Sequence, residues 1–329
     1  MCVTLSGGET VDVDPLPQAG SDRRYFRLSY GDRSCIGAYV PDANEGECFV
    51  KLAECFRSYG CNVPNIYAVS HDFHYYLQED LGDLSLFSSL KDENLEQLVM
   101  QTLDRLVKLQ KTPEEIWKKE CVCKDFCRRQ VMWDLNYFKY EYVKPANVIF
   151  NEDLLENDLE KLADRLISIP RLLWGFMMRD CQSRNVMVTR RGPFFIDFQG
   201  GRFGPSLYDA VSLLWQARAG FSPGFRDKML DYYTDRYCGG DPELKKEMLR
   251  SLGDVVLFRT LQVLGAYGFR GLVQHRSHFL LSIPAALSNL NELLEKDVIK
   301  CYPELANLAS KLVAGLQTKG IVKESGLTV

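Results

Sequence analysis

Three polar residues in the second half of the chain have types and spacings that suit phosphoryl transfer. Residues 179–185 are Arg-Asp-Cys-Gln-Ser-Arg-Asn, so Asn185 comes five residues after Asp180, and Asp197 follows twelve residues later. An aspartate at the first position can accept the proton of an attacking hydroxyl, while the asparagine and the second aspartate can hold magnesium. The spacing predicts a catalytic base at Asp180 and a magnesium site at Asn185 and Asp197.

These residues flank a segment that is predicted to form a β-hairpin. Val186–Thr189 and Pro193–Ile196 are short apolar runs typical of strands, and Arg190–Gly192 between them is typical of a turn. The hairpin would carry Asn185 at its start and Asp197 at its end to the same place, where both are needed to hold magnesium. A single aspartate in such a segment is more often a turn or cap residue. Three groups spaced around one hairpin favour a catalytic site instead.

The residues before position 80 are predicted to form a small β-sheet with one helix. Turn residues at Gly20–Arg24 and Gly31–Asp32 separate runs that are typical of strands. Apolar residues recur at helical spacing from Asn44 to Tyr59, and Gly60 is a typical stop signal. The predicted strands are the Val11–Leu16 region, Tyr25–Tyr30, Cys35–Val40, Asn65–Val69 and Phe73–Gln78.

The rest of the chain is predicted to be mainly helical. The expected fold class is α+β: a small antiparallel-sheet lobe precedes a large, mainly helical lobe. The polar segment Glu79–Asp83 lies between them. The predicted helices are Leu95–Leu109, Phe126–Tyr140, Leu154–Ile167, Ser206–Arg218, Phe225–Tyr237 and Leu244–Gly268.

Composition narrows the class of protein. With 329 residues, of which 46% are hydrophobic and 26% charged, the chain is large enough for two lobes with a sizeable core. Its net charge of −4 argues against a nucleic-acid partner, because binding to phosphates requires a positive surface. No apolar run is long enough to span a membrane, and neither a signal peptide nor a disulfide framework is indicated by the N-terminus or the 11 cysteines. A cytoplasmic protein with no membrane partner is expected.

Five segments carry patterns that occur together, in this order, in one known group of enzymes. They are Ser21–Arg27, Glu79–Asp83, Arg179–Asn185, Ile196–Gln199 and Gly204–Asp209. The chain resembles the aminoglycoside phosphotransferase and choline kinase superfamily, which has the protein-kinase-like fold. Within it, the chain is most similar to the anomeric sugar kinases that phosphorylate N-acetylmuramate and N-acetylglucosamine at the C1 hydroxyl. The resemblance covers nearly the whole chain. It implies a two-lobe protein-kinase-like fold, with a nucleotide-binding lobe at residues 1–80, a catalytic and substrate-binding lobe at residues 81–329, and a hinge near residues 79–83.

This resemblance implies an enzyme that uses ATP and Mg²⁺ to phosphorylate a small-molecule sugar. It makes Asp180 the catalytic base and Asn185 and Asp197 the magnesium ligands, with Arg179 and Asp209 supporting the catalytic loop. The implied nucleotide-binding residues are Glu79, Asp80 and Leu81, whose backbone would meet adenine, and Ser21, Asp22, Arg23 and Arg24, which would cover the phosphates. Weaker candidates for contact with the sugar are Arg184 and Gln199.

Two departures from the usual kinase pattern stand out. Met178 occupies the position before Arg179 where kinases have a histidine that supports the catalytic loop. The predicted third strand, Cys35–Val40, contains no lysine, although kinases place one there to bind the α- and β-phosphates. Arg23 or Arg24 could supply this charge, since guanidinium groups bind phosphate well, but a surface role for either is an equal alternative.

Other functions stay open at the level of sequence. An aminoglycoside kinase would need a strongly acidic pocket for a polycation, and a choline kinase an aromatic cage for a quaternary amine. A pseudokinase, which would bind nucleotide without turnover, is favoured by Met178 and by the missing lysine. The intact set of Asp180, Asn185 and Asp197 favours an active enzyme.

Overall fold

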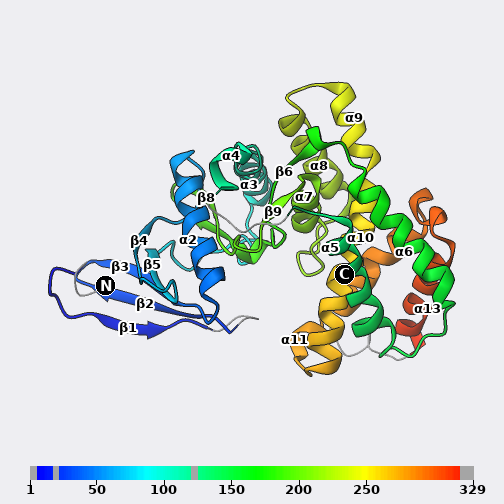
Figure 1. Ribbon diagram of the computed structural model, residues 1–329, viewed down its shortest axis with the longest axis horizontal. Helices are drawn as coiled ribbons and strands as arrows, with labels where there is room; N and C mark the ends of the chain where they lie inside the picture. The colour runs from blue at the N-terminus through cyan, green and yellow to red at the C-terminus, as the bar shows by residue number, and fades with distance from the viewer. Residues whose placement is uncertain (1–5, 18–21, 120–124, 319–329) are drawn as a thin grey trace. The chain divides into compact units, whose positions relative to one another are not determined.

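The structure is a computed structural model that describes residues 6–17, 22–119 and 125–318 (Figure 1). The chain forms two compact units. The first contains Met1–Asp125 and Trp174–Asp209, and the second contains Phe126–Leu173 and Ala210–Val329. The sheet and the predicted catalytic loop therefore belong to the same unit. The hinge near residues 79–83 lies within this first unit and stays a prediction.

The first unit contains an antiparallel sheet of five strands in the order β1-β2-β3-β5-β4. Gly31, with φ of +52°, turns the chain between β2 and β3, where glycine accepts the left-handed conformation without strain. In the register of this hairpin Leu28 lies opposite Cys35, and both pack with Leu77 in a buried cluster. The strands are β1 (Asp12–Pro15), β2 (Arg24–Tyr30), β3 (Arg33–Tyr39), β4 (Ile66–Val69) and β5 (Tyr75–Glu79).

Helix α2 (Ala43–Ser58) links the sheet to the catalytic segments of the same unit. The side chain of Asp42 caps its N-terminus by accepting a hydrogen bond from the backbone of Asn44. Phe49 of α2 stacks on Tyr76 of β5 at 5.1 Å and on Phe198 at 4.8 Å between ring centroids. This aromatic stack ties the first turns of α2 and the segment after Asp197 to one core.

Gly46 allows α2 to approach a neighbouring loop closely. A Cβ atom at this position would lie 2.1 Å from the carbonyl oxygen of Phe73, which is far inside van der Waals contact. Only glycine fits without moving the start of the helix, which also carries Glu45.

The remaining elements of the first unit lie wholly within it, except that α7 begins in the first unit and continues into the second. Strand β6 precedes the catalytic loop in sequence and β7, β8 and β9 follow it, and they form two short antiparallel ribbons, β6–β9 and β7–β8. The β7–β8 hairpin was predicted, whereas β6 and β9 were not. Their bounds are α3 (Leu95–Gln110), α4 (Glu114–Trp117), β6 (Trp174–Met177), η3 (Ser183–Asn185), β7 (Val186–Thr189), β8 (Gly192–Phe195), β9 (Arg202–Pro205) and α7 (Leu207–Leu214).

The second unit is helical and is built around α10, which is buried over most of its circumference and packs against α5 and α12. Its elements are α5 (Arg128–Phe138), η1 (Lys139–Val143), α6 (Glu152–Ile167), η2 (Arg171–Leu173), α8 (Pro223–Cys238), α9 (Pro242–Arg250), α10 (Leu252–Tyr267), η4 (Gly268–Val273), α11 (Ser277–Leu280), α12 (Ile283–Leu294), η5 (Asp297–Cys301) and α13 (Pro303–Thr318).

One predicted helix is wrong. The segment Leu244–Gly268 was expected to be continuous, but it forms two helices, α9 and α10, which meet at Ser251. The hydroxyl of Ser251 donates to the carbonyl oxygen of Met248 at 2.8 Å. Such a side-chain bond competes with the backbone hydrogen bonds of a helix. The apolar periodicity continues across Ser251, so the periodicity alone did not reveal the break.

The α+β class with a five-stranded antiparallel sheet and a mainly helical remainder is confirmed. Among the described residues, no helix combines the length and apolar character needed to cross a membrane.

Candidate active site

Backbone hydrogen bonds build the catalytic loop between β6 and β7. The amide of Asn185 donates to the carbonyl of Gln182 at 2.8 Å, and the amide of Ile196 donates to the carbonyl of Asn185 at 3.0 Å. The second bond extends the β7–β8 hairpin to its open end. As the local pattern predicted, the start and the end of the hairpin lie side by side.

Asp209, whose side chain is fully buried, supports this loop through hydrogen bonds to its backbone. Its two carboxylate oxygens accept hydrogen bonds from the backbone amides of Met178 at 2.7 Å and Arg179 at 3.0 Å. Arg179 has φ of +69°, a conformation that costs a non-glycine residue about 1–3 kcal/mol. The two charge-assisted bonds offset that strain and hold the residue before Asp180 in place.

A second buried side chain, from α3, completes this support. Nε2 of Gln110 donates to the carbonyl of Ser206 at 2.8 Å and to Asp209 at 3.4 Å. Met178, at the usual histidine position, is itself buried and contributes only its backbone amide to Asp209. Sequence reasoning missed Gln110, and a lone glutamine at a helix end carries no signal that could have identified it.

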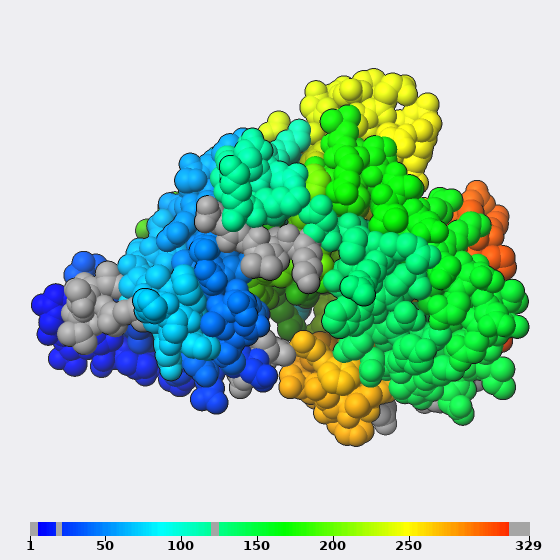
Figure 2. Space-filling model, in the orientation of Figure 1, coloured from blue at the N-terminus to red at the C-terminus, as the bar shows by residue number. Residues whose placement is uncertain are grey.

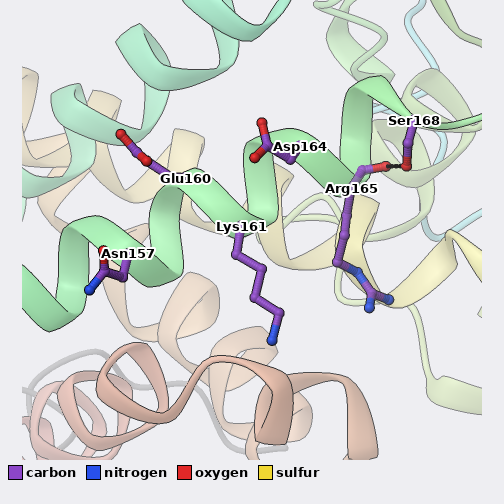
Figure 3. A pocket seen from close by; sticks show the side chains of 6 residues that line it. All are labelled: Asn157, Glu160, Lys161, Asp164, Arg165 and Ser168. Atoms are coloured by element: carbon purple, nitrogen blue, oxygen red, sulfur yellow. Dashed lines mark hydrogen bonds between the residues drawn. The ribbon is translucent and has the colours of Figure 1, made fainter.

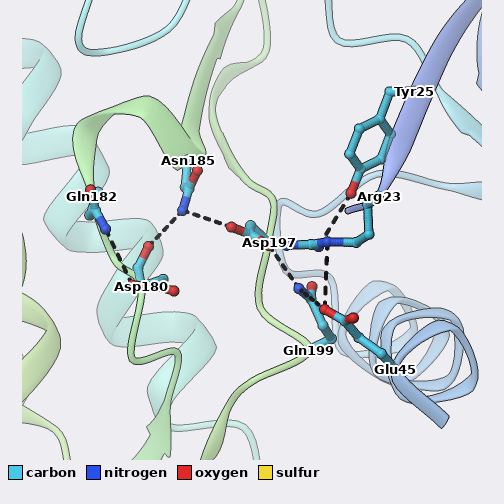
Figure 4. A network of polar contacts seen from close by, with 8 residues as sticks. All are labelled: Arg23, Tyr25, Glu45, Asp180, Gln182, Asn185, Asp197 and Gln199. Atoms are coloured by element: carbon cyan, nitrogen blue, oxygen red, sulfur yellow. Dashed lines mark hydrogen bonds and ion pairs between the residues drawn. The ribbon is translucent and has the colours of Figure 1, made fainter. Parts of the chain in front are cut away.

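The structure brings Asp180, Asn185 and Asp197 together (Figure 4). Nδ2 of Asn185 donates to the carbonyl oxygen of Asp180 at 2.9 Å and to Oδ2 of Asp197 at 3.3 Å. The Asp180 side chain is exposed and accepts a hydrogen bond from Nε2 of Gln182 at 3.2 Å. An exposed carboxylate next to the loop backbone is accessible to an incoming hydroxyl.

Asn185 and Asp197 offer the kinds of atom that magnesium binds. Asp197 lies two residues after the end of β8 and has φ of +63°, which aspartate tolerates better than most residues. Since Nδ2 of Asn185 is engaged, its amide oxygen is the atom that can bind a metal. Carboxylate and amide oxygens suit Mg²⁺, which usually takes its remaining ligands from phosphates and water.

No protein-only metal cage accompanies this pair. Within the part of the chain that the structure describes, no group of three or more His, Cys, Asp and Glu side chains could hold a metal ion by itself. The donor set therefore fits a metal that binds together with a nucleotide, as in kinases.

Arg23 occupies the centre of a polar network with Asp197 (Figure 4). One guanidinium nitrogen lies 2.6 Å from Oδ1 of Asp197, Nε lies 3.5 Å from Glu45 in the first turn of α2, and NH1 donates to the Tyr25 hydroxyl at 3.3 Å. Burial works against the charge of Arg23, but Asp197 and the other neighbours raise its pKa above the usual value. Burial also raises the pKa of Tyr25, so the phenol stays neutral and its oxygen accepts from Arg23.

Gln199 closes the network. Its Nε2 donates to Oδ1 of Asp197 at 2.7 Å and to Oε1 of Glu45 at 3.1 Å. Its Oε1 is buried without a hydrogen-bond partner, so it is an acceptor that an incoming donor can satisfy. Sequence reasoning did not select Glu45, although kinases place the glutamate that pairs with their lysine on the helix after the third strand.

Two acidic side chains of the predicted hinge bond to other segments of the protein. Asp80 accepts hydrogen bonds from Nε of Arg27 at 2.7 Å, from the Ser34 hydroxyl at 2.7 Å and from the amide of Gly82 at 2.9 Å. Burial would raise the pKa of Asp80, but these bonds lower it below its usual value. Glu79 pairs with Arg191 and accepts two bonds from Asn65. Because both carboxylates serve the protein's own structure, a nucleotide contact from this segment would have to come from backbone atoms.

The other predicted residues are more peripheral. Asp22 and Arg24 are exposed, and Leu81 is half-buried. Arg184 is exposed, with its guanidinium 4.7 Å from the centre of the Phe87 ring. Ser21 lies outside the described residues.

A surface hollow on the second unit does not involve these residues. In the space-filling view, green side chains of the segment that includes α6 lie at the surface (Figure 2), and an open hollow of about 500 Å³ runs along this helix (Figure 3). Arg165 in the hollow pairs with Asp254 at 2.7 Å, and Lys161 donates to the carbonyl of Cys301 at 2.9 Å. Its charged groups thus serve helix packing. The lining residues are Asn157, Glu160, Lys161, Asp164, Arg165 and Ser168.

A five-stranded sheet with one helix, followed by a braced Arg-Asp loop and by an asparagine and an aspartate across a hairpin, defines the class of kinases with the protein-kinase-like fold. The chain belongs to the phosphotransferase enzyme family, whose model matches residues 12–246. The protein is therefore a kinase.

Two curated relatives bear on the kind of acceptor that the kinase uses. The chain is 27% identical over 305 residues to the N-acetylmuramate/N-acetylglucosamine kinase of Neisseria meningitidis serogroup B, covering 88% of this chain and 86% of that protein. It is 26% identical to the N-acetylmuramate/N-acetylglucosamine kinase of Pseudomonas aeruginosa, covering 93% and 90% of the two chains. These similarities support a sugar kinase within the family.

Solved structures agree on the fold. A choline/ethanolamine kinase family protein from Mesorhizobium loti matches with a TM-score of 0.60 and 13% identity, covering 94% of each chain. A thermostable mutant of the aminoglycoside phosphotransferase APH(4)-Ia, in ternary complex with ADP and hygromycin B, matches with a TM-score of 0.56 and 14% identity, covering 95% of this chain and 97% of that one. At such low identity these matches show the fold alone.

Proposed function

We propose that this kinase uses ATP and Mg²⁺ to phosphorylate the anomeric hydroxyl of an N-acetylated amino sugar, N-acetylmuramate or N-acetylglucosamine or both. The observation that carries the proposal is the convergence of Asp180, Asn185 and Asp197 at one hairpin, bridged by the Asn185 amide. The names of the curated relatives supply the acceptor class.

In the proposed mechanism, Asp197 and Asn185 would hold magnesium, which would neutralise charge on the nucleotide phosphates. Asp180 orients the sugar hydroxyl and accepts its proton. An anomeric hydroxyl is more acidic than an ordinary alcohol, so an exposed carboxylate is a sufficient base. Asp209 keeps the loop in position through its two backbone hydrogen bonds. This support matters because most of the acceleration in phosphoryl transfer comes from positioning and electrostatic stabilisation.

The nucleotide-binding roles follow from the contacts of each segment. We propose that the backbone of residues 79–81 meets the adenine base, since the Asp80 and Glu79 side chains are engaged elsewhere. The segment that includes Ser21, Asp22, Arg23 and Arg24 would cover the phosphates. Arg184 and Gln199 are proposed as sugar contacts, and the buried, unpaired Oε1 of Gln199 is the most specific feature that supports either of them.

The test is phosphate transfer from ATP with Mg²⁺ to a panel of acceptors: N-acetylmuramate, N-acetylglucosamine, simple hexoses, choline and an aminoglycoside. The phosphorylated position of each product is identified by NMR, and Asp180→Asn serves as the control. A 1-phosphate of an N-acetylated amino sugar that disappears in Asp180→Asn is expected.

The other results point to different functions. Phosphorylation of choline or of the aminoglycoside alone would replace the proposed acceptor. Nucleotide binding without transfer to any member of the panel would favour a pseudokinase, and it can be detected because a ligand that binds only the folded state raises the melting temperature.

A further inference from the structure

The third strand of the sheet does not supply the cation that kinases use to bind nucleotide phosphates. β3 carries one basic residue, Arg33, which is exposed at the start of the strand with its guanidinium 5.2 Å from the centre of the Tyr30 ring. In kinases the cation is a lysine of the third strand, which pairs with a glutamate of the following helix, and the pair must form for activity. The corresponding pair in this protein has to come from elsewhere.

Arg23, which precedes β2, has the partner that this role requires. Its guanidinium contacts Glu45 in the first turn of α2, the helix that follows β3. It is also held by Tyr25, and its side chain is only 12% exposed. Arg24, the other sequence candidate, is exposed as the first residue of β2. The structure thus distinguishes between two residues that the sequence left equivalent.

The arrangement around Asp197 sets Arg23 in competition with a metal ion. Oδ1 of Asp197 accepts from Arg23 at 2.6 Å and from Gln199 at 2.7 Å, and Oδ2 accepts from Asn185 at 3.3 Å. Oδ1 already holds two donors, so magnesium, which binds carboxylate oxygens directly and closely, can take Oδ1 only if one of these donors leaves. Arg23 is the donor that carries a positive charge, and two cations at one carboxylate repel each other.

We propose that Arg23 is an exchangeable cation of the active site: it neutralises Asp197 when metal and nucleotide are absent, and it binds the nucleotide phosphates when magnesium takes Asp197. Glu45 and Tyr25 keep Arg23 beside the site in both states. This inference rests on the proposed use of ATP and Mg²⁺. It assigns to the Arg23–Glu45 pair the role that a lysine of the third strand has in other kinases.

The exchange predicts opposite effects of Arg23 on two ligands. Arg23 opposes metal binding in the absence of nucleotide, because it occupies the metal's ligand. It favours the metal–nucleotide complex, because its guanidinium then bonds to phosphate oxygens. A residue that was only structural would not shift these two affinities in opposite directions.

The experiment measures the affinities of purified wild-type, Arg23→Gln, Glu45→Gln and Arg33→Gln proteins. The probes are Mn²⁺ alone, followed by its paramagnetic resonance signal, and the non-hydrolysable analogue AMP-PNP with Mg²⁺, followed by calorimetry. For Arg23→Gln we expect about 10- to 100-fold weaker AMP-PNP binding, the size of a lost charge-assisted hydrogen bond, and about 5-fold tighter Mn²⁺ binding.

The other variants separate the roles within the pair. Glu45→Gln leaves Arg23 on Asp197, so AMP-PNP binding should weaken without any gain in Mn²⁺ affinity. Arg33→Gln removes the same charge from the start of β3 and should change neither affinity. Thermal melting of each variant without ligands establishes that it is folded, and Glu45→Gln still tests the nucleotide arm should Arg23→Gln fail to fold.

Two failures are distinguishable. Wild-type protein that binds Mg²⁺ with AMP-PNP while Arg23→Gln or Glu45→Gln binds it equally well overturns this inference and leaves the proposed function intact. The same holds if Arg23→Gln loses Mn²⁺ affinity together with nucleotide affinity. Wild-type protein that does not bind the analogue at all overturns both.

Discussion

Replacement of Asp209 by asparagine tests the idea that the catalytic loop is held by one buried carboxylate. The carboxylate accepts two backbone amides, from Met178 and Arg179, at 2.7 and 3.0 Å. A hydrogen bond to a charged group contributes about 1.5–3 kcal/mol. Asparagine keeps one acceptor oxygen and faces the second amide with its own NH₂ group. We therefore expect Asp209→Asn to lower the free energy of unfolding by about 1.5–3 kcal/mol.

The same change should also slow catalysis. Without its bond to Asp209, Arg179 can relax from its φ of +69°, and the adjacent Asp180 moves with it. Misplacement of a catalytic group by about 1 Å costs about 100-fold in rate, so kcat should fall by about that factor. Urea unfolding gives the stability, and steady-state kinetics with the best acceptor give kcat.

Asp158 provides a control in the second unit. Its buried carboxylate also accepts two backbone amides, from Glu304 and Leu305, at 2.8 and 2.9 Å, and both bonds end on Oδ2 and cap α13. Because asparagine could keep both bonds through its single amide oxygen, the control is Asp158→Ala, which should cost at least as much stability as Asp209→Asn and leave kcat unchanged at a temperature where the protein is folded. If Asp209→Asn keeps wild-type kcat, or if both variants lose kcat equally, the assigned role of Asp209 is refuted.

Three further outcomes are expected. Asp80→Asn should cost about 1–3 kcal/mol of stability at pH 7, because the bonds from Arg27 and its neighbours lower the pKa of Asp80. This stability exists above the unfolded-state pKa of about 4 and is lost as pH falls below it. Urea unfolding should therefore show the stabilities of the two proteins converging in acid, and a constant difference would contradict the assignment. Gly46→Ala should lower the melting temperature despite the better helix propensity of alanine, since its Cβ would lie 2.1 Å from a backbone oxygen; unchanged melting would show that α2 can shift freely. Asp197→Ala should abolish turnover through loss of the metal, while Asp180→Asn should lose rate and keep nucleotide affinity in calorimetry, and equal loss of nucleotide binding in both would argue against their separate roles.

The parts of the site that could be predicted are local in the chain. Asn185 and Asp197 are joined by one hairpin, whose alternation of apolar runs and turn residues is visible in the sequence. Asp180 follows from its spacing to Asn185 alone. The strands of the five-stranded sheet were predicted for the same reason, because each is a short apolar run bounded by turn residues. Such patterns express backbone preferences that act over a few residues.

Long-range partners could not be predicted from spacing. Arg23 and Asp197 are 174 positions apart, and Gln110 and Asp209 are 99 apart, yet each pair is in hydrogen-bond contact. Which polar groups meet depends on how the apolar faces pack and on which buried donors and acceptors must be satisfied. The break at Ser251 was missed for a related reason, since a side chain bonded to the backbone there and the apolar pattern did not change.

The class of chemistry could be predicted from the sequence alone, together with three residues proposed to carry it out, because phosphoryl transfer needs a base and two metal ligands at spacings that a loop and a hairpin set locally. The tertiary structure decided what supports and neutralises them. Only the packing of α2 against the sheet places Glu45 beside Arg23, and only the burial of Asp209 beneath the loop fixes the strained backbone before Asp180. Those choices depend on contacts between segments far apart in the chain, where side-chain shape and the cost of burying an unpaired polar group outweigh local preference.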